Sequence, residues 1–417
     1  ENDNWFGTGL AAGCYIPGNQ GTAYFGAGPS PGADTASGQF CTAGDPIYNA
    51  APIGSDGFAG YPPSGVSSYS RHSWAAYVDL EADITDNFLA TVAGRYEDFS
   101  DFGSNFSWRV AALWRINDVL RLRASAGTGF RAPTPGQLST INIRTTVTTD
   151  TPLEIALLPA DHPVAAFKGA TPLDAETSTQ FTLGVTATPF DALTITLDYY
   201  FIALDDQIWV SSNMLLDDAE RTLLQTTVSG VRYFTNDIDT ESSGIDLVAT
   251  YDLDWSGGST VFSLAGNMND FKVTRRTDRR TDPADPPEFF VNDTGVFRAE
   301  NGSPEYRFIF LLRHNWDNDI SASLRANWYG NYELAEEDFS DGSVAQTQTM
   351  GGVVYLDAEV SWDVGELLNV TLGANNVFNE FPDRNPCFSF CVGQVYDANS
   401  VMDWQGRFVY LRGALRW

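Results

Sequence analysis

The chain has 417 residues, enough for two or three ordinary domains or for one large β architecture. Its 54 acidic residues outnumber 24 basic ones, and the resulting formal net charge of −30 has the opposite sign to that of a nucleic-acid-binding protein. Hydrophobic residues make up 43% of the chain, which excludes a disordered acidic protein. The longest apolar run, Tyr199 to Leu204, is far shorter than the ~18 residues of a membrane-spanning helix.

The first 69 residues differ in composition from the rest of the chain. They contain no lysine or arginine, and they hold 14 of the 37 glycines and seven prolines. They show neither sustained alternation nor helical periodicity. This composition predicts one long loop over residues 1–69.

The four cysteines fall into two local pairs, one in this loop and one near the end of the chain. The pairs are Cys14 with Cys41 and Cys387 with Cys391. Each lies in a stretch rich in turn-forming residues, and the three histidines are scattered rather than spaced as zinc ligands. The pattern favours two disulfides formed in an oxidising compartment over a metal site. We expect neither a bound metal nor a cofactor.

From Ser70 onward, segments of about ten residues alternate between apolar and polar side chains, a period typical of β-strands with two different faces. In the clearest segment, Phe106, Trp108 and Val110 alternate with Ser107 and Arg109. Helical periodicity is almost absent, so we predict an all-β fold. Thirteen segments are predicted as strands: 70–84, 88–98, 105–116, 119–130, 175–188, 193–209, 241–253, 259–273, 303–315, 320–333, 352–364, 368–378 and 405–417.

The connections between these segments alternate in length. Tight turns such as Asn117-Asp118 and Asp191-Ala192 alternate with longer connections, of which only 99–104 is short. The long connections, predicted as loops, are 131–174, 210–240, 274–302, 334–351 and 379–404. This arrangement is typical of an outer-membrane β-barrel with short periplasmic turns and long extracellular loops.

A soluble β-sandwich or propeller is the alternative, because it also alternates two faces. Against it, the minority face of the long strands carries charges such as Arg121, Arg123, Asp357 and Glu359, which suit a water-filled lumen. Aromatic residues also lie near strand ends, as in the interfacial girdles of membrane barrels: Trp74, Phe106, Trp114, Trp328, Trp362, Trp404 and Trp417. We therefore predict a transmembrane antiparallel β-barrel over residues 70–417.

The predicted number of strands is odd, whereas bacterial single-chain barrels close with an even number and with both termini in the periplasm. If the last strand runs into the periplasm, the strand near Ser70 does so too. Residues 1–69 are then an extracellular loop. We therefore expect the chain to be the C-terminal part of a larger barrel.

Arg121 to Pro133, with the sequence RLRASAGTGFRAP, resembles the mid-barrel signature of TonB-dependent outer-membrane receptors, and Gln137-Leu138 follows it as in that family. Further segments recur in the order of the family: Leu183 to Val185, Leu197 to Tyr200, Gly244 to Leu247, Leu372 to Asn379 and Gly406 to Trp417. The resemblance implies a barrel of roughly 22 strands around a plug, with the plug upstream of this chain. It also implies that Phe408, Tyr410 and Trp417 form the signal read by the barrel assembly machinery.

Candidate ligand contacts lie where predicted strands give way to predicted extracellular loops. Arg131 places a charge at the mouth or in the lumen. Arg275 and Arg276 belong to a basic cluster that could attract an anionic ferric siderophore or bind lipopolysaccharide phosphates, with a solvated loop face as the alternative. Five aromatic residues could stack on a ligand or pack one loop on another: Trp209, Tyr233, Phe234, Phe289 and Phe290.

The resemblance implies an active transporter in the bacterial outer membrane, energised by TonB acting on the plug. No catalytic residues are identified, so no enzymatic activity is expected. A passive porin is the alternative, and an outer-membrane hydrolase is a third reading with no Ser–His pair to support it. The expected partners are TonB, outer-membrane lipid and lipopolysaccharide, and a small-molecule ligand. Ferric siderophores, cobalamin, oligosaccharides and aromatic compounds all remain open as the ligand.

Overall fold

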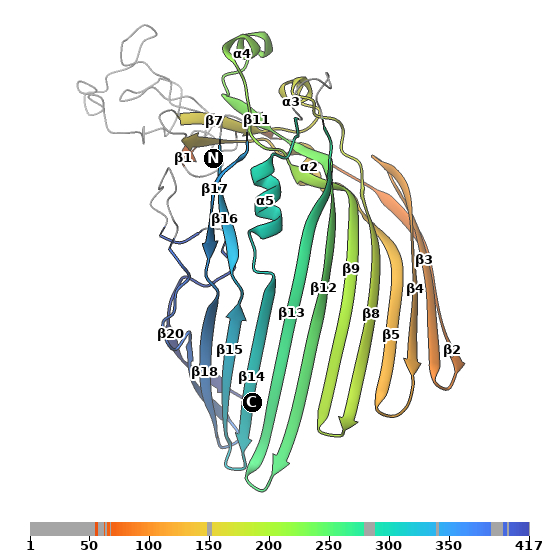
Figure 1. Ribbon diagram of the computed structural model, residues 1–417, viewed down its shortest axis with the longest axis vertical. Coiled ribbons are helices and arrows are strands. Elements are labelled where there is room, and N and C mark those ends of the chain that lie inside the picture. Colours follow the sequence, from red (N-terminus) through yellow and green to blue (C-terminus); the bar gives the residue numbers. More distant parts are fainter. Residues whose placement is uncertain are drawn as a thin grey trace, which may run out of the picture.

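The main feature of the fold is a sheet of thirteen antiparallel strands, paired in chain order (Figure 1). The computed structural model describes Ser55, Asp56, Pro62, Gly65, Val66 and residues 68–147, 152–278, 288–338, 342–384, 395–397 and 400–416. The strands of the sheet are β2 (Ser73–Thr85), β3 (Phe88–Phe99), β4 (Gly103–Arg115), β5 (Leu120–Arg131), β8 (Glu176–Phe190), β9 (Leu193–Val210), β12 (Phe234–Trp255), β13 (Gly258–Arg276), β14 (Tyr306–Trp316), β15 (Ile320–Tyr329), β18 (Val353–Val364), β19 (Leu368–Asn375) and β20 (Phe408–Leu415). Each overlaps one predicted segment, although β12 begins seven residues before its segment, inside the predicted loop 210–240. The predicted fold class is confirmed. Within the described residues β2 and β20 are the two edges, and the sheet does not close.

Strand register places apolar and polar side chains in separate rows. One row crosses β8, β9, β12 and β13 and consists of apolar side chains that are 42–54% exposed: Leu183, Tyr199, Ile245 and Met268. The neighbouring row, one residue along each strand, consists of Gly184 and three polar residues: Asp198, Asp246 and Asn267. Because successive side chains point to opposite faces, the two rows lie on opposite sides of the sheet. One face therefore suits lipid and the other suits water, as in a barrel wall.

The two ends of the sheet differ, as the alternating connections predicted. Tight turns join the strands at the lower end of Figure 1, which we call the turn end, and the longer connections lie at the upper, loop end. Strands β9, β12 and β13 have 18, 22 and 19 residues, more than the 9 to 11 or so that cross a bilayer. Their upper ends therefore carry the sheet beyond the membrane. No helix among the described residues has the length and apolar character of a membrane span.

The loop end contains a second sheet, which we call the loop sheet. It has the order β1-β6-β7-β11-β10 and consists of β1 (Ser55–Asp56), β6 (Asn142–Val147), β7 (Pro152–Leu157), β11 (Gly230–Arg232) and β10 (Met214–Leu215). The short helices α2 (Pro135–Ser139), α3 (Pro163–Phe167) and α4 (Asp218–Leu224) lie in the same connections. One face of the loop sheet packs against α3 through buried residues that include Ile143, Ala156, Val164 and Val231. Segments predicted as loops thus contain strands and helices with their own hydrophobic core.

A third unit covers the loop ends of β14, β15 and β18. The hairpin of β16 (Tyr332–Glu337) and β17 (Val344–Met350) packs against α5 (Asp293–Asn301). Arg298 of α5 donates from Nε and Nη2 to the Ala335 carbonyl oxygen at 3.2 and 2.9 Å. Tyr332, Met350, Tyr355 and Met402 form a small buried cluster beneath it. Both loop units are therefore held in place by packing as well as by hydrogen bonds.

Candidate functional site

The candidate site begins where β9 and β12 leave regular pairing. Their register shifts twice between Asn236 and Thr240, and Asp206 on the facing strand adopts a φ of 54°, in the left-handed region. Side chains bond the backbone there. Asp206 N donates to Asp239 Oδ1 at 2.9 Å, and Asn236 Nδ2 donates to the Asp206 carbonyl oxygen at 2.7 Å. The bulge is thus stabilised by side chains from the neighbouring strand.

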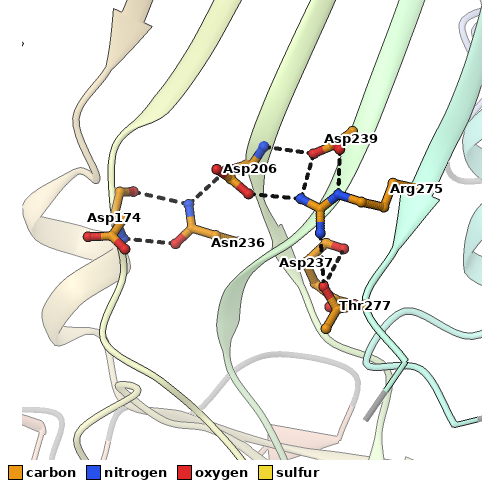
Figure 2. Close-up of polar contacts among 7 residues, drawn as sticks. All are labelled: Asp174, Asp206, Asn236, Asp237, Asp239, Arg275 and Thr277. Carbon is orange, nitrogen blue, oxygen red and sulfur yellow. Dashed lines mark hydrogen bonds and ion pairs between the residues drawn. The ribbon is translucent and has the colours of Figure 1, made fainter.

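Around this bulge lies a set of bonded residues that we call the polar junction: Asp174, Asp206, Asn236, Asp237, Asp239, Arg275 and Thr277 (Figure 2). Arg275, on β13, is its centre. Its Nη2 donates to Asp239 Oδ1 at 2.7 Å and to Asp206 Oδ1 at 2.8 Å, and its Nη1 donates to Thr277 Oγ1 at 3.1 Å. The guanidinium proposed from the sequence as a ligand contact is therefore engaged by two carboxylates of its own chain.

Asn236 extends the junction to the segment that precedes β8. Its Oδ1 accepts a hydrogen bond from Asp174 N at 2.9 Å, and its Nδ2 donates to the Asp174 carbonyl oxygen at 3.0 Å. With its bond to Asp206, the amide bridges two backbone segments. The junction therefore ties the loop before β8 to the upper ends of β9, β12 and β13.

Arg131 lies at the loop end of β5 and forms a two-point ion pair with Glu176 of β8. Arg131 Nε and Nη2 donate to the two carboxylate oxygens of Glu176 at 2.5 and 2.6 Å. Glu176 Oε1 also accepts from Ile208 N at 2.6 Å, and its side chain is 5% exposed against 58% for Arg131. Arg131 thus keeps an exposed flank at the mouth of the sheet while Glu176 fixes its orientation.

The aromatic candidates divide into a buried and a partly exposed group. Tyr233 is fully buried, donates from its hydroxyl to the Lys168 carbonyl oxygen at 2.8 Å, and lies edge-to-face with Phe290 at 5.7 Å between ring centroids. Both belong to the hydrophobic core of the loop sheet. Trp209 and Phe234 are partly exposed on paired strands, at the upper ends of β9 and β12. Loop packing thus accounts for Tyr233 and Phe290.

Arg276 is oriented by contacts within its own loop. Its Nη1 donates to Asp293 Oδ1 at 2.8 Å and to the Val291 carbonyl oxygen at 3.2 Å. Its guanidinium carbon lies 3.9 Å from the centre of the Phe289 ring, a cation–π geometry. Arg276 and Phe289 therefore form one unit at the base of α5.

The structure brings all eight loop candidates to the loop end of β5 to β13. Arg131 reaches Ile208, next to Trp209, through Glu176, and Trp209 lies beside the first residues of β12. Tyr233 contacts Phe290, and the neighbouring Phe289 contacts Arg276. The eight candidates therefore lie on neighbouring elements at one end of the sheet.

Other sequence-based candidates lie elsewhere. On β20, Tyr410 donates from its hydroxyl to Glu359 Oε2 at 2.7 Å and stacks on Phe408 at 6.0 Å between ring centroids. The third residue of the proposed assembly signal, Trp417, lies outside the described residues. The proposed disulfides also lie outside them, because Cys14, Cys41, Cys387 and Cys391 are all in segments that are not described. Most of the expected loop 1–69 is likewise outside.

Three polar residues of the loop sheet were missed by the sequence analysis: Asn142, Arg144 and Arg232. Each has a buried side-chain atom without a hydrogen-bond partner in the described structure. A signal for the strand was present, since Ile141, Ile143 and Thr145 alternate with Asn142 and Arg144. Among the described residues, no group of three His, Cys, Asp or Glu side chains is placed to hold a metal ion.

The comparisons with known proteins agree with this architecture. Residues 1–377 match the family model described as TonB dependent receptor-like, beta-barrel. A 64-residue segment is 33% identical to the iron-regulated outer membrane virulence protein of Vibrio cholerae serotype O1, covering 15% of this chain and 10% of that protein.

Two solved structures share the fold at low sequence identity. A variant of the ferric enterobactin receptor PfeA of Pseudomonas aeruginosa is similar with a TM-score of 0.57 and 14% identity, over 83% of this chain and 45% of that chain. The siderophore receptor PirA of Acinetobacter baumannii is similar with a TM-score of 0.55 and 15% identity, over 87% and 48%. The chain thus spans about half the length of these structures.

The family match covers most of the chain, and the thirteen antiparallel strands with their apolar and polar faces agree with a β-barrel wall. It also supports the expectation that the chain is not an enzyme, and it favours a receptor over a porin. The chain belongs to the family of TonB-dependent receptors, as part of the outer-membrane β-barrel.

Proposed function

We propose that this chain forms wall and extracellular loops of a receptor that captures an iron-carrying siderophore and moves it across the outer membrane with energy from TonB. The observation that carries the proposal is the loop end itself. There, arginines of β5 and β13 lie at the same end of the sheet as aromatic side chains of β9 and of the adjoining loops. The names of the V. cholerae, P. aeruginosa and A. baumannii proteins, which refer to iron or siderophores, support this ligand class.

Two side chains are assigned to ligand contact: Trp209 and the exposed flank of Arg131. Phe234 is not assigned, because it is the partner of Val210 and therefore points to the opposite face of the sheet from Trp209. Aromatic rings supply large, rigid contact area, and a guanidinium held by a carboxylate still presents donors to an anionic ligand. Tyr233 and Arg275 are assigned to positioning, because their polar atoms are engaged within the chain.

The test is uptake of radioactive iron by cells that produce the complete receptor and lack other siderophore receptors. Individual ferric siderophores are supplied with and without a protonophore, which removes the energy that TonB transmits. We expect uptake of at least one siderophore, abolished by the protonophore. A diffusion channel would continue to take up its solute, so uptake that persists with the protonophore would contradict the proposal.

Site variants then test the assignment of ligand contacts. Trp209→Ala should weaken siderophore binding about tenfold, by loss of a ring contact. The matched control is Trp362→Ala, which removes a tryptophan that is 53% exposed on the apolar face of the sheet. Both are compared at equal amounts of assembled receptor. Equal affinity of Trp209→Ala and the unmodified receptor would remove Trp209 from the site.

A further inference from the structure

The loop sheet has two faces of different character. Ile143, Ala156 and Val231 are partners across β6, β7 and β11, and they form the apolar face that packs under α3. The next residues along these strands point the opposite way. Arg144 is the partner of Ile155, and Asn142 and Arg232 are both partners of Leu157 on the central strand, β7. Asn142, Arg144 and Arg232 therefore share the second face.

These three side chains have polar atoms that the described structure leaves unsatisfied. Nε of Arg144, Nε of Arg232 and Oδ1 of Asn142 are buried, and none has a hydrogen-bond partner there. Neither arginine is in an ion pair within the described residues, whereas Arg131, Arg275 and Arg276 each bond a carboxylate. Buried polar groups in proteins are normally satisfied, so the exception needs an explanation.

The electrostatic environment also indicates that these two arginines lack a charged partner. Burial lowers the pKa of Arg144, and burial together with the nearby charge of Arg144 lowers the pKa of Arg232 to about 10. Two guanidinium groups that are partly removed from water and repel each other raise the free energy of the folded loop sheet. An anion placed between them would satisfy both the charge and the free N–H groups.

We propose that Arg144 and Arg232, with Asn142 beside them, bind the carboxylate or phosphate group of a small soluble ligand. The planar fork of a guanidinium matches both groups through two parallel hydrogen bonds. Asn142 adds an amide that accepts from a ligand hydroxyl through Oδ1 or, after rotation, donates through Nδ2. A neutral sugar would leave both charges uncompensated and is a poorer match.

The position of this face suits a ligand that enters from outside. In Figure 1 the loop sheet lies above the strands of the barrel sheet, at the end where the long connections are, so the site lies beyond the membrane-spanning part of the strands. The claim that the bound anion is part of an imported molecule rests on the proposed function. The anion site itself does not.

The experiment is calorimetric titration of the complete receptor in detergent with citrate and, separately, with inorganic phosphate. We expect saturable binding of at least one, weakened about tenfold or more in Arg144→Gln and in Arg232→Gln, through loss of a charge-assisted bidentate contact. The control is Arg221→Gln, which removes an arginine of α4 that bonds Asp218 on the same helix. Binding to both test variants that equals that of the unmodified receptor would overturn the proposal.

A stability measurement separates an anion site from a structural role. Without added anion, Arg144→Gln should unfold at the same temperature as the unmodified receptor or higher, since one of two repelling charges is gone. Citrate should raise the unfolding temperature of the unmodified receptor and not that of the variant. A lower unfolding temperature for the variant without anion would contradict an unpaired charge. Should Arg144→Gln fail to fold, Arg144→Lys keeps the charge but lacks the fork, and it should bind citrate less tightly.

Two further arms separate the alternatives. Lipopolysaccharide micelles that displace citrate would assign the site to lipid phosphate and contradict a small soluble ligand. Uptake measured in parallel distinguishes this site from the proposed function. Loss of citrate binding in Arg144→Gln supports the site even where uptake proves independent of energy. Unchanged citrate binding refutes the site even where uptake is energised.

Discussion

Asn236 offers the sharpest test of how the loop end is held. Its side-chain amide makes three hydrogen bonds, one from Asp174 N, one to the Asp174 carbonyl oxygen and one to the Asp206 carbonyl oxygen. Asn236→Ala removes all three and leaves the strands themselves untouched. At about 1 kcal/mol for each bond, reduced because the site is partly exposed, the loop before β8 should lose about 2 kcal/mol of local stability.

The measurement is native-state hydrogen exchange at Asp174 N. When exchange follows local opening, a loss of about 2 kcal/mol accelerates it about 30-fold. Asn236→Asp sharpens the test, because a carboxylate accepts from Asp174 N but cannot donate to either carbonyl oxygen. Its exchange should therefore also be faster than that of the unmodified receptor.

The matched control is Asn301→Ala, which removes a single amide bond to the Phe297 carbonyl oxygen within α5. It should leave exchange at Asp174 unchanged. Exchange at Asp174 that stays within about threefold of the unmodified receptor in Asn236→Ala, a change of less than about 0.7 kcal/mol, would refute the reasoning. The segment before β8 would then be held by something other than the polar junction.

Three further predictions follow from single contacts. Glu176→Ala should lower the free energy of unfolding by about 2 kcal/mol, because it leaves the buried Ile208 N–H unsatisfied. Arg131→Ala should lower it by less, and thermal unfolding of the purified barrel measures the effect of each variant. Gly184→Ala should reduce the yield of folded barrel on heat-modifiability gels, because a Cβ there would overlap the Asp198 carboxylate and lie 2.7 Å from Arg123 Nε. The control, Gly413→Ala, should leave the yield unchanged, because a Cβ at Gly413 has no atom within 4 Å. Tyr233→Phe should destabilise the loop sheet by about 1 kcal/mol, and Tyr233→Ala should destabilise it by about 3 to 5 kcal/mol. The measurement is the rate of proteolysis at the loop end, and equal rates for the two variants would contradict a packing role.

The thirteen strands were predictable because each carries its own evidence. A strand between lipid and water shows alternation within about ten residues, whatever its neighbours are. In β4, Phe106, Trp108 and Val110 are 40–61% exposed on one face, as the alternation predicted. Strand number and order therefore followed from local patterns and from the alternating lengths of the connections.

The strands of the loop sheet were missed because their buried residues do not alternate with exposed ones. In β7, Ile155 and Ala156 are adjacent and each is only 1% exposed, so neighbouring positions do not contrast in polarity. Strands β10 and β11 have two and three residues, too few for any period to appear. Their existence depends on pairing between segments far apart in the sequence.

The same limit applies to the site residues. Arg275 was recognised as one of several basic residues, but its partners Asp239 and Asp206 lie 36 and 69 positions away. The bulge that brings Asp206 toward it depends on how β9 pairs with β12. Local sequence therefore indicated a charge at the loop end, whereas only the register shows that this charge is compensated.

For the choice of ligand, whether each arginine of the loop end has a carboxylate partner matters more than the net charge of the chain. The chain carries a net charge of −30, which by itself disfavours an anionic ligand. At short range an individual charge can outweigh the net charge of the chain, because a charge acts strongly only where water and counter-charges are excluded. Arg131, Arg275 and Arg276 have carboxylates of their own, while Arg144 and Arg232 have none in the described residues. The acidic composition of the chain is therefore compatible with the proposed anion site at Arg144 and Arg232.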